Sequence, residues 1–177
     1  MTRRCPTVLA TLLALAGAPH TRAGEPPNEG HLACGGATLT ARTQFREVAD
    51  HDRQVVSQAI TIVAAGTKTA LPLKLDAHPL RQPFLRDALV LDAAVTGWAC
   101  VTSTDGKPYV YLVMTCAESS RRPACVGTLR EWTRLYDMHG RALDAGLPRD
   151  GPRKSALLKR LKLGRLDDGV SMSDPTE

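Results

Sequence analysis

The sequence predicts a mainly β protein, in which an antiparallel sheet curls into a small sandwich or barrel, with one C-terminal helix and two disulfides. Three observations predict this class. Several segments alternate apolar and polar residues with a period of two, which is typical of half-buried strands. An Asp105-Gly106 pair separates two such segments, as in a β-hairpin. Four cysteines follow a leader-like N-terminus, and an even cysteine count in an exported chain favours disulfides.

Residues 1–23 have the features of a cleavable signal peptide. Two arginines open the chain, and the uncharged run 5–18 is too short to span a bilayer, which requires about 20 apolar residues. Small residues favour cleavage after Ala23, and cleavage after Ala18 is the alternative. Because 17 Arg against 6 Lys is typical of a GC-rich bacterial genome, we predict a periplasmic protein exported through this leader.

The net charge of the mature chain is small. The full sequence carries +5, but removing three arginines and no acid leaves 20 basic and 18 acidic residues, or +2. A bulk positive charge that would attract nucleic acid is therefore a property of the leader, and we predict no nucleic-acid partner. A second long apolar segment is absent from the sequence, so we also expect no stable membrane insertion.

The domain is predicted to begin after a flexible arm, 24–33, whose first half is polar and rich in Pro and Gly. A single β-rich domain then spans 34–166. Alternation predicts its first strand over 36–45, and a β-branched apolar run predicts a buried strand over 54–65. The charged segment between them, 47–53, is expected to form a turn or one helical turn.

A third strand is predicted over 67–76, where leucines alternate with polar residues. Pro72 lies within it and removes a backbone donor, which indicates an edge strand. The following segment, 78–87, contains two prolines and is expected to form a surface loop.

The clearest signal is a hairpin of strands 89–102 and 108–116 around a two-residue Asp105-Gly106 turn. In that register the numbers of opposed residues sum to 211, so Cys100 faces Tyr111. One face is then wholly apolar and is assigned to the core; it comprises Val95, Gly97, Ala99, Val101, Val110, Leu112 and Met114. The other face comprises Thr96, Trp98, Cys100, Thr102, Tyr109, Tyr111 and Val113.

The C-terminal third is predicted to hold a strand over 131–136, a turn at His139-Gly140 and a helix over 152–163, which starts at a proline and precedes a glycine. Residues 167–177 are expected to form a frayed tail. The helix has an apolar stripe of Leu157, Leu158 and Leu161, while Lys154, Lys159, Arg160 and Lys162 are predicted to face solvent.

The same hairpin register ranks the disulfides. Cys100 and Cys116 are out of register and too far apart to bond. We therefore favour Cys34–Cys100 with Cys116–Cys125, and the alternative is Cys34–Cys116 with Cys100–Cys125. The sequence contains no CxxC and no histidine at ligand spacing, so no zinc site and no cofactor are expected.

Catalytic motifs are absent from the sequence, including the GxSxG, HExxH and SxxK patterns. A nucleophilic cysteine needs a free thiol, which two disulfides would not leave. We therefore predict a protein that is not an enzyme. The alternative is a hydrolase whose acid and base come from distant positions, such as Glu118, Glu131 and Asp137.

Two groups of residues are candidates for binding a partner. Trp98, Tyr109 and Tyr111 would cluster on one hairpin face, as aromatic side chains do at interfaces, or would form a second buried layer. Arg121 and Arg122 lie in the predicted Cys116–Cys125 loop, where they could enter an acidic cleft or remain solvated.

The segment Cys34-Gly35-Gly36, followed by Thr38-Leu39-Thr40, resembles the start of the small periplasmic β-barrel lysozyme inhibitors. The similarity covers seven residues, and the remaining chain departs from the pattern of that family, including its inhibitory-loop residues. No site is carried over from it.

These observations predict an exported, non-enzymatic binding protein, of the inhibitor or immunity kind, that acts on an envelope enzyme or toxin. The alternative is an accessory subunit of a cell-envelope assembly, docked through the aromatic face or the Pro72 edge strand. In both cases the expected partner is another protein.

Overall fold

The computed structural model describes residues 26–49, 52–79, 89–116, 131–148, 150–164, 166 and 173–176. Most of these residues lie in strands, which confirms the mainly β class. The strands are β1 (Asn28–Cys34), β2 (Ala37–Ala49), β3 (Asp52–Ala64), β4 (Thr67–Ala70), β5 (Ala77–Pro79), β6 (Leu89–Leu91), β7 (Ala93–Thr102), β8 (Pro108–Cys116) and β9 (Glu131–Asp137), followed by helix α1 (Pro152–Arg160).

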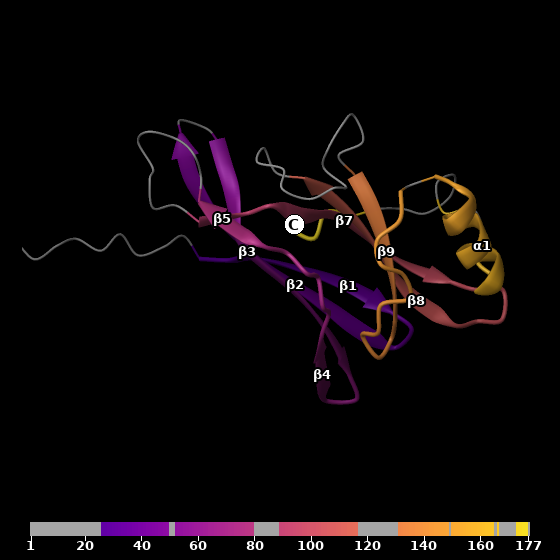
Figure 1. Cartoon of the computed structure of the whole chain (residues 1–177). Helices are drawn as coiled ribbons and strands as arrows, with labels where there is room; N and C mark the ends of the chain where they lie inside the picture. The colour runs from indigo at the N-terminus through magenta and orange to yellow at the C-terminus, as the bar shows by residue number, and fades with distance from the viewer. Residues whose placement is uncertain are drawn as a thin grey trace, which may run out of the picture.

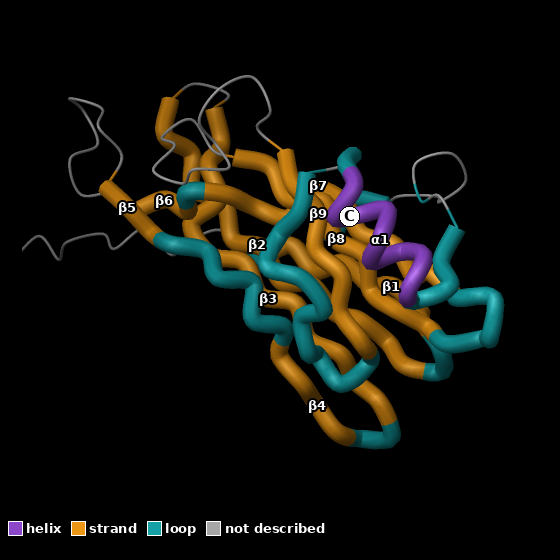
Figure 2. Tube along the Cα trace, turned by 45° about the vertical axis from the view of Figure 1, so that its right-hand side comes forward, coloured by secondary structure: helices purple, strands orange, loops and turns teal. Residues whose placement is uncertain are grey.

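Two antiparallel sheets carry the architecture (Figure 1). One has four strands in the order β1-β2-β3-β4, and the other has three in the order β7-β8-β9. A two-stranded ribbon, β5-β6, joins them in sequence. Figure 2 shows the strands of both sheets, with α1 lying against the β8–β9 side.

The main core lies between the two sheets. It contains Leu39 and Ala41 of β2 together with Ile60 and Ile62 of β3, because every second residue of a strand points to the same face of the sheet. The facing sheet contributes the large side chains of Trp98, Val110, Leu112, Met114, Trp132 and Tyr136. Each large apolar side chain that is fully buried in this way stabilises the fold by about 1.5–3 kcal/mol.

A second core lies on the other face of the three-stranded sheet. Tyr109 and Tyr111 of β8 and Leu135 of β9 pack there against Leu158 of α1. Leu163 and Leu166, which follow the helix, complete this cluster. The three-stranded sheet is therefore buried on both faces, as the apolar residues on both sides of β7 and β8 require.

The predicted register of the β7–β8 hairpin is wrong by one residue. Cys100 pairs with Val110, and Ala99 pairs with Tyr111, so the opposed numbers sum to 210. The loop holds three residues, because Ser103 N–H donates to the Lys107 carbonyl at 2.9 Å and Gly106 N–H donates to the Ser103 carbonyl at 2.9 Å. Gly106 takes a φ of 80°, as the last residue of a three-residue loop requires.

This one-residue difference places each face of β7 beside the opposite face of β8 from the one predicted. Trp98 and Cys100 share the main core with Val110, while Ala99 and Val101 share the second core with Tyr109. The predicted wholly apolar face, which grouped Ala99 and Val101 with Val110 and Leu112, is therefore not formed. Both faces are in fact apolar, so alternation alone did not distinguish the two registers.

A bulge in β7 changes which residues of the strand point into the main core: odd-numbered residues before it and even-numbered residues after it. The register shifts between Val95 and Gly97, which leaves Thr96 as the extra residue. Val95 consequently reaches the main core together with Trp98. Next to the bulge, the side chain of Gln58 in β3 binds both backbone groups of Val95. Val95 N–H donates to Gln58 Oε1 at 2.7 Å, and Gln58 Nε2 donates to the Val95 carbonyl at 3.0 Å.

Two N-terminal segments that were not predicted as strands form strands in the structure. Residues 28–33, predicted as part of a flexible arm, belong to β1, which pairs with β2 through Leu32 and Leu39. The strand was missed because Asn28 and Gly30, at two of its inward positions, are not apolar and give no alternation with the outward residues. The segment 47–53, predicted as a turn, lies largely in the long β2–β3 hairpin, with Ala49 opposite Asp52.

The predicted edge strand is confirmed but shorter. β4 ends at Ala70, and Pro72 lies in the following irregular segment, where Leu71 and Leu73 remain buried. The predicted loop 78–87 lies mostly outside the described residues, but Ala77–Pro79 forms β5 and pairs with β6.

The predicted frayed tail is contradicted where it is described. Ser173 exchanges two backbone hydrogen bonds of 3.1 Å with Trp98, on the side of β7 away from β8. Pro175 is fully buried, and Asn28 Nδ2 donates to the Thr176 carbonyl at 3.3 Å. These residues are held by tertiary contacts that their polar sequence does not reveal.

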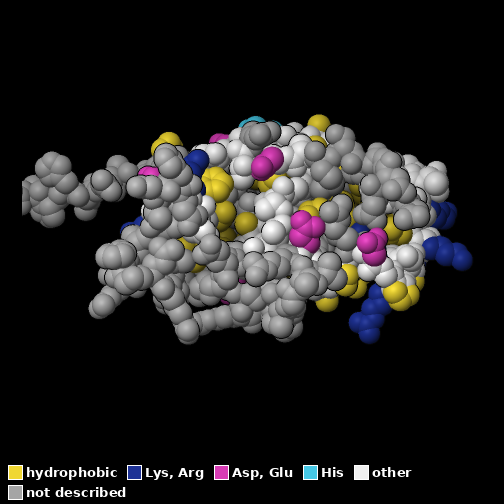
Figure 3. All heavy atoms as spheres, turned by 90° about the horizontal axis from the view of Figure 1, so that it is seen from above, with side chains coloured by type: hydrophobic (Ala, Val, Ile, Leu, Met, Phe, Trp, Pro, Cys, Tyr) yellow, Lys and Arg dark blue, Asp and Glu magenta, His cyan; other side chains and the backbone are white. Residues whose placement is uncertain are grey.

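Helix α1 matches its predicted start and apolar stripe, with Leu157 and Leu158 buried. Lys154 was predicted to face solvent, and this is wrong, because its side chain is 5% exposed. Lys159 and Arg160 are exposed as predicted. Seen from above, Lys and Arg side chains project at the end of the molecule that carries α1 (Figure 3).

The predicted Cys34–Cys100 disulfide is confirmed, with an S–S distance of 2.07 Å and Cα atoms 5.2 Å apart. It joins β1 of the four-stranded sheet to β7 of the three-stranded sheet. Cys125 lies outside the described residues, so its pairing with Cys116 stays a prediction.

The Cys34–Cys100 bond closes a loop with a sequence separation of 66. Replacing both cysteines with alanine (C34A/C100A) is expected to lower the free energy of unfolding by about 4 kcal/mol, because the unfolded chain regains loop entropy. The measurement is urea unfolding of the oxidised proteins, with a far-UV spectrum of each as a control for folding. A loss below about 1 kcal/mol would show that the bond contributes little beyond the packing around it.

Candidate functional site

The structure places the predicted aromatic residues inside the protein, on two different faces. Trp98 is 1% exposed in the main core, while Tyr109 and Tyr111 are 9% and 4% exposed beneath α1. They do not form one patch, since the register that would have grouped them is not formed. The arginine pair, Arg121 and Arg122, lies outside the described residues.

Tyr111 has a clear structural role. Lys154 Nζ of α1 donates a hydrogen bond of 2.6 Å to Tyr111 Oη, and the same ammonium lies 4.9 Å from the centroid of that ring. Both side chains are buried. A buried charge is costly unless it is paired or hydrogen-bonded, so these contacts fix where the helix docks on the sheet.

A second buried polar group anchors the segment after β4. Arg134 Nη1 donates to the carbonyls of Pro72 and Leu73 at 3.1 and 3.2 Å, and Tyr136 Oη donates to the Pro72 carbonyl at 3.2 Å. Burial is the largest effect on Tyr136 and raises the pKa of its hydroxyl. These groups bind backbone oxygen atoms and therefore serve the fold.

Asp144 lies in the segment 141–147, which bonds along the outer edge of β9. Its two oxygens accept hydrogen bonds from the Leu135 and Gly146 N–H groups at 2.9 and 2.7 Å. Burial nevertheless raises the pKa of this carboxyl above its ordinary value of 3.8, against the opposing effect of those hydrogen bonds and of the Arg134 and Lys154 charges.

The acidic residues proposed for a hydrolase do not meet where they are described. Glu131 and Asp137 are the first and last residues of β9, which places them about 20 Å apart at roughly 3.4 Å per residue. Asp137 accepts hydrogen bonds from the His139 and Arg141 N–H groups and so stabilises the turn after β9. Glu118 lies outside the described residues.

Of the faces of the two main sheets, the outer face of the four-stranded sheet is the one that no described element covers. The strand registers arrange its side chains in three rows across the sheet. The first row is Glu29, Arg42 and Ala59; the second is His31, Thr40, Thr61 and Ala70; the third is Ala33, Thr38, Val63 and Lys68. We call these three rows the outer face.

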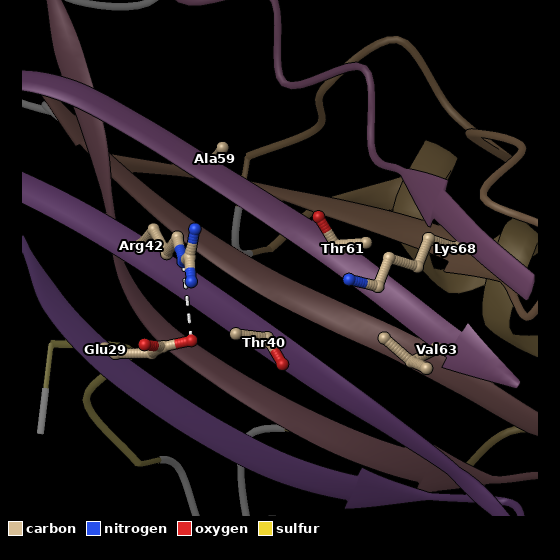
Figure 4. Close-up of a pocket in the computed structure, with 7 residues that line it drawn as sticks. All are labelled: Glu29, Thr40, Arg42, Ala59, Thr61, Val63 and Lys68. Atoms are coloured by element: carbon tan, nitrogen blue, oxygen red, sulfur yellow. Dashed lines mark hydrogen bonds and ion pairs between the residues drawn. The ribbon is translucent and has the colours of Figure 1, made fainter. Parts of the chain in front are cut away.

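A shallow cavity of about 190 Å³ lies on the outer face. Figure 4 shows small side chains between two long cations: Arg42 lies on one side, Lys68 on the other, and Thr61 between them. The cavity exists because Ala59, Thr40 and Thr61 are short while their neighbours are long. Such a surface can hold an extended chain or a small polar group.

Charge on the outer face is unbalanced. Arg42 Nε lies 3.4 Å from Glu29 Oε1 in an ion pair whose side chains are 66% and 41% exposed. Lys68 has no ion-pair partner among the residues that the structure describes. The three charged side chains around the cavity therefore sum to one positive charge.

Sequence reasoning missed this surface, although part of its signal was present. The alternation in β2 correctly assigned Thr38, Thr40 and Arg42 to one face. Glu29 was placed in a flexible arm, and the position of Lys68 next to Val63 depends on the β3–β4 pairing. The sequence alone therefore could not show that Glu29 and Lys68 border the same cavity as Arg42.

Comparisons with family models, with curated proteins and with solved structures find no match to this chain. Within the described segments, no group of three or more His, Cys, Asp or Glu side chains is placed to hold a metal ion. No helix in the same segments has the length and apolar character needed to cross a membrane.

The Tyr111–Lys154 contact predicts energetic coupling between α1 and the sheet. Y111F and K154M should each lower the free energy of unfolding, by about 1.5–3 kcal/mol for a hydrogen bond to a charged group. The double variant should lose less than the sum of the two by about 0.5–3 kcal/mol. Urea unfolding measures all three, and K159M, on the exposed side of the same helix, is the matched control. Strictly additive losses would refute the coupling.

The raised pKa of Asp144 predicts a pH dependence of stability. The folded protein holds the Asp144 proton more tightly than the unfolded chain does, so this contribution is fully present below pH 3.8 and is lost as the pH rises through the raised pKa. The free energy of unfolding of the wild type minus that of D144N should therefore fall as the pH rises. Urea unfolding between about pH 3 and pH 7 tests the slope, and a flat or rising difference would contradict it.

Proposed function

We propose that this protein is an exported, non-enzymatic binding protein, of the inhibitor or immunity kind, and that it binds an envelope-acting enzyme or toxin through the outer face. The observation that supports this proposal is the contrast between its two sheets. The three-stranded sheet is covered on both sides, while the outer face presents polar and charged side chains around a cavity.

The rigidity of the sheet beneath the outer face supports the same proposal. β2 and β3 pair along nearly their whole lengths, and their inward residues Leu39, Ala41, Ile60 and Ile62 are at most 1% exposed. The Cys34–Cys100 bond fixes β1 at the end of this sheet. A binding surface that is ordered before the partner arrives loses little conformational entropy on association.

The alternative is an accessory subunit of a cell-envelope assembly, and one observation favours it. β4 occupies an edge of its sheet, and the β3–β4 hairpin projects away from the rest of the molecule (Figure 1). An exposed edge strand can accept a strand from a neighbouring subunit. In that case the partner would pair with the β4 backbone rather than cover the outer face.

Photo-crosslinking in cells tests the proposal. A photoreactive phenylalanine analogue placed at Thr40 or Thr61 should yield a crosslinked protein partner, because both side chains point out of the outer face. The matched control is the same analogue at Lys159, which is exposed on α1 at the opposite side of the layers. The readout is the mass and identity of each adduct after purification under denaturing conditions.

The outcomes separate the two functions. One defined adduct with an envelope enzyme or toxin, formed from Thr40 and Thr61 but not from Lys159, supports the proposal. Recovery of several subunits of one large complex favours the accessory role. Adducts that form equally from all three positions, or from none, count against a binding role for the outer face.

A further inference from the structure

We propose that the outer face recognises an extended acidic segment of its protein partner, with a carboxylate held between Arg42 and Lys68. This inference rests on the proposed function, since it names the chemistry of the partner at that surface. It follows from the positions of the two cations, the composition of the floor between them and the way Glu29 orients Arg42.

The two cations approach the cavity from opposite corners. Arg42 of β2 stands opposite Ala59 of β3, and Lys68 of β4 stands opposite Val63. Their Cα atoms are thus separated by two strand spacings across the sheet and four residues along it, or about 17 Å. Both side chains border the same cavity, with Thr61 between them (Figure 4).

The floor suits a peptide. Ala59 and Thr61 are short, so a second chain can lie close to the sheet, and the hydroxyls of Thr40 and Thr61 can each donate to a carboxylate or a peptide carbonyl. The described lining residues carry no aromatic ring, and single-stranded nucleic acid depends on aromatic side chains for stacking. An extended peptide places alternate side chains on one side, about 7 Å apart, and so can present acidic groups repeatedly to the face.

Glu29 binds one nitrogen of Arg42 and leaves the other two guanidinium nitrogens for a partner. The ion pair uses Nε alone, at 3.4 Å, and exposed pairs of this kind contribute about 0–1 kcal/mol. The two terminal amino groups of Arg42 have no acceptor among the described residues. A guanidinium presents these groups as a fork that matches a carboxylate. Repulsion from Glu29 would direct that carboxylate toward the Lys68 side of Arg42.

Glu29 is the only acidic side chain in the three described rows around the cavity. His31, in the row next to Arg42, contacts Thr40 Oγ1 through Nδ1 at 3.3 Å and faces outward. Two cations against one carboxylate therefore favour an acidic occupant over a basic one, and complementary charge steers association as well as specificity.

Peptide titration of the full-length mature protein tests this inference. The probe is a capped hexapeptide of alternating threonine and glutamate, and its control replaces each glutamate with glutamine. Amide shifts of 15N-labelled protein should move at Thr40, Thr61 and Val63, with an apparent Kd at least tenfold weaker for the glutamine peptide. R42Q/K68Q should weaken binding of the glutamate peptide at least tenfold. R153Q/K159Q removes the same charge from exposed positions of α1 and should change the Kd less than twofold.

Three results would overturn the inference. They are equal binding of the two peptides, shifts centred away from the outer face, and equal losses in R42Q/K68Q and R153Q/K159Q. Displacement of the peptide by polygalacturonate at equal carboxylate concentration would assign the site to an acidic polysaccharide instead. If the peptides fail while Thr40 and Thr61 still crosslink one defined protein, the partner uses other chemistry and the proposed function stands; if both fail, both are rejected.

Discussion

The structure depends on one constraint: the three-stranded sheet carries apolar side chains on both faces and so must be covered twice. Trp98 and Leu112 need the inner face of the four-stranded sheet, and Tyr111 needs helix α1. Water is thereby excluded from both sides of the central layer, which is the dominant favourable term in folding. The four-stranded sheet uses one face to supply this cover, and its other face is left for solvent or a partner.

Directional contacts then determine how the layers are aligned. Apolar burial is not directional, whereas a hydrogen bond requires a donor–acceptor distance of about 2.7–3.2 Å and weakens steeply as its angle bends. Gln58 bonds to both backbone groups of Val95, Arg134 holds the Pro72 carbonyl, and Lys154 holds Tyr111. Each of these contacts joins elements far apart in the sequence. Together with the Cys34–Cys100 bond, they hold the two sheets and the helix in one alignment.

The sequence predicted the elements better than their relative positions. Alternation located β2 and β4, a β-branched apolar run located β3, the Asp105-Gly106 turn located β7 and β8, and Pro152 marked the start of α1. The hairpin register was not predictable for two reasons. Two-residue and three-residue loops can both use the positive φ of Gly106, and both faces of β7 are apolar. Lys154 was misassigned because helical periodicity treats lysine as polar, and its Tyr111 partner lies 43 residues away.

Separate residues of the same strands support the fold and form the outer face. In β2, Leu39 and Ala41 point into the core, while Thr40 and Arg42 between them point outward, and the same division holds for Ile60 and Thr61 in β3. Changing an outward residue therefore leaves the inward packing intact and has little effect on stability. The candidate partner residues inferred from the sequence, Trp98 and the two tyrosines, lack this freedom because they fill the cores. The proposed binding surface, unlike the two cores, therefore consists of residues that can change without loss of the fold.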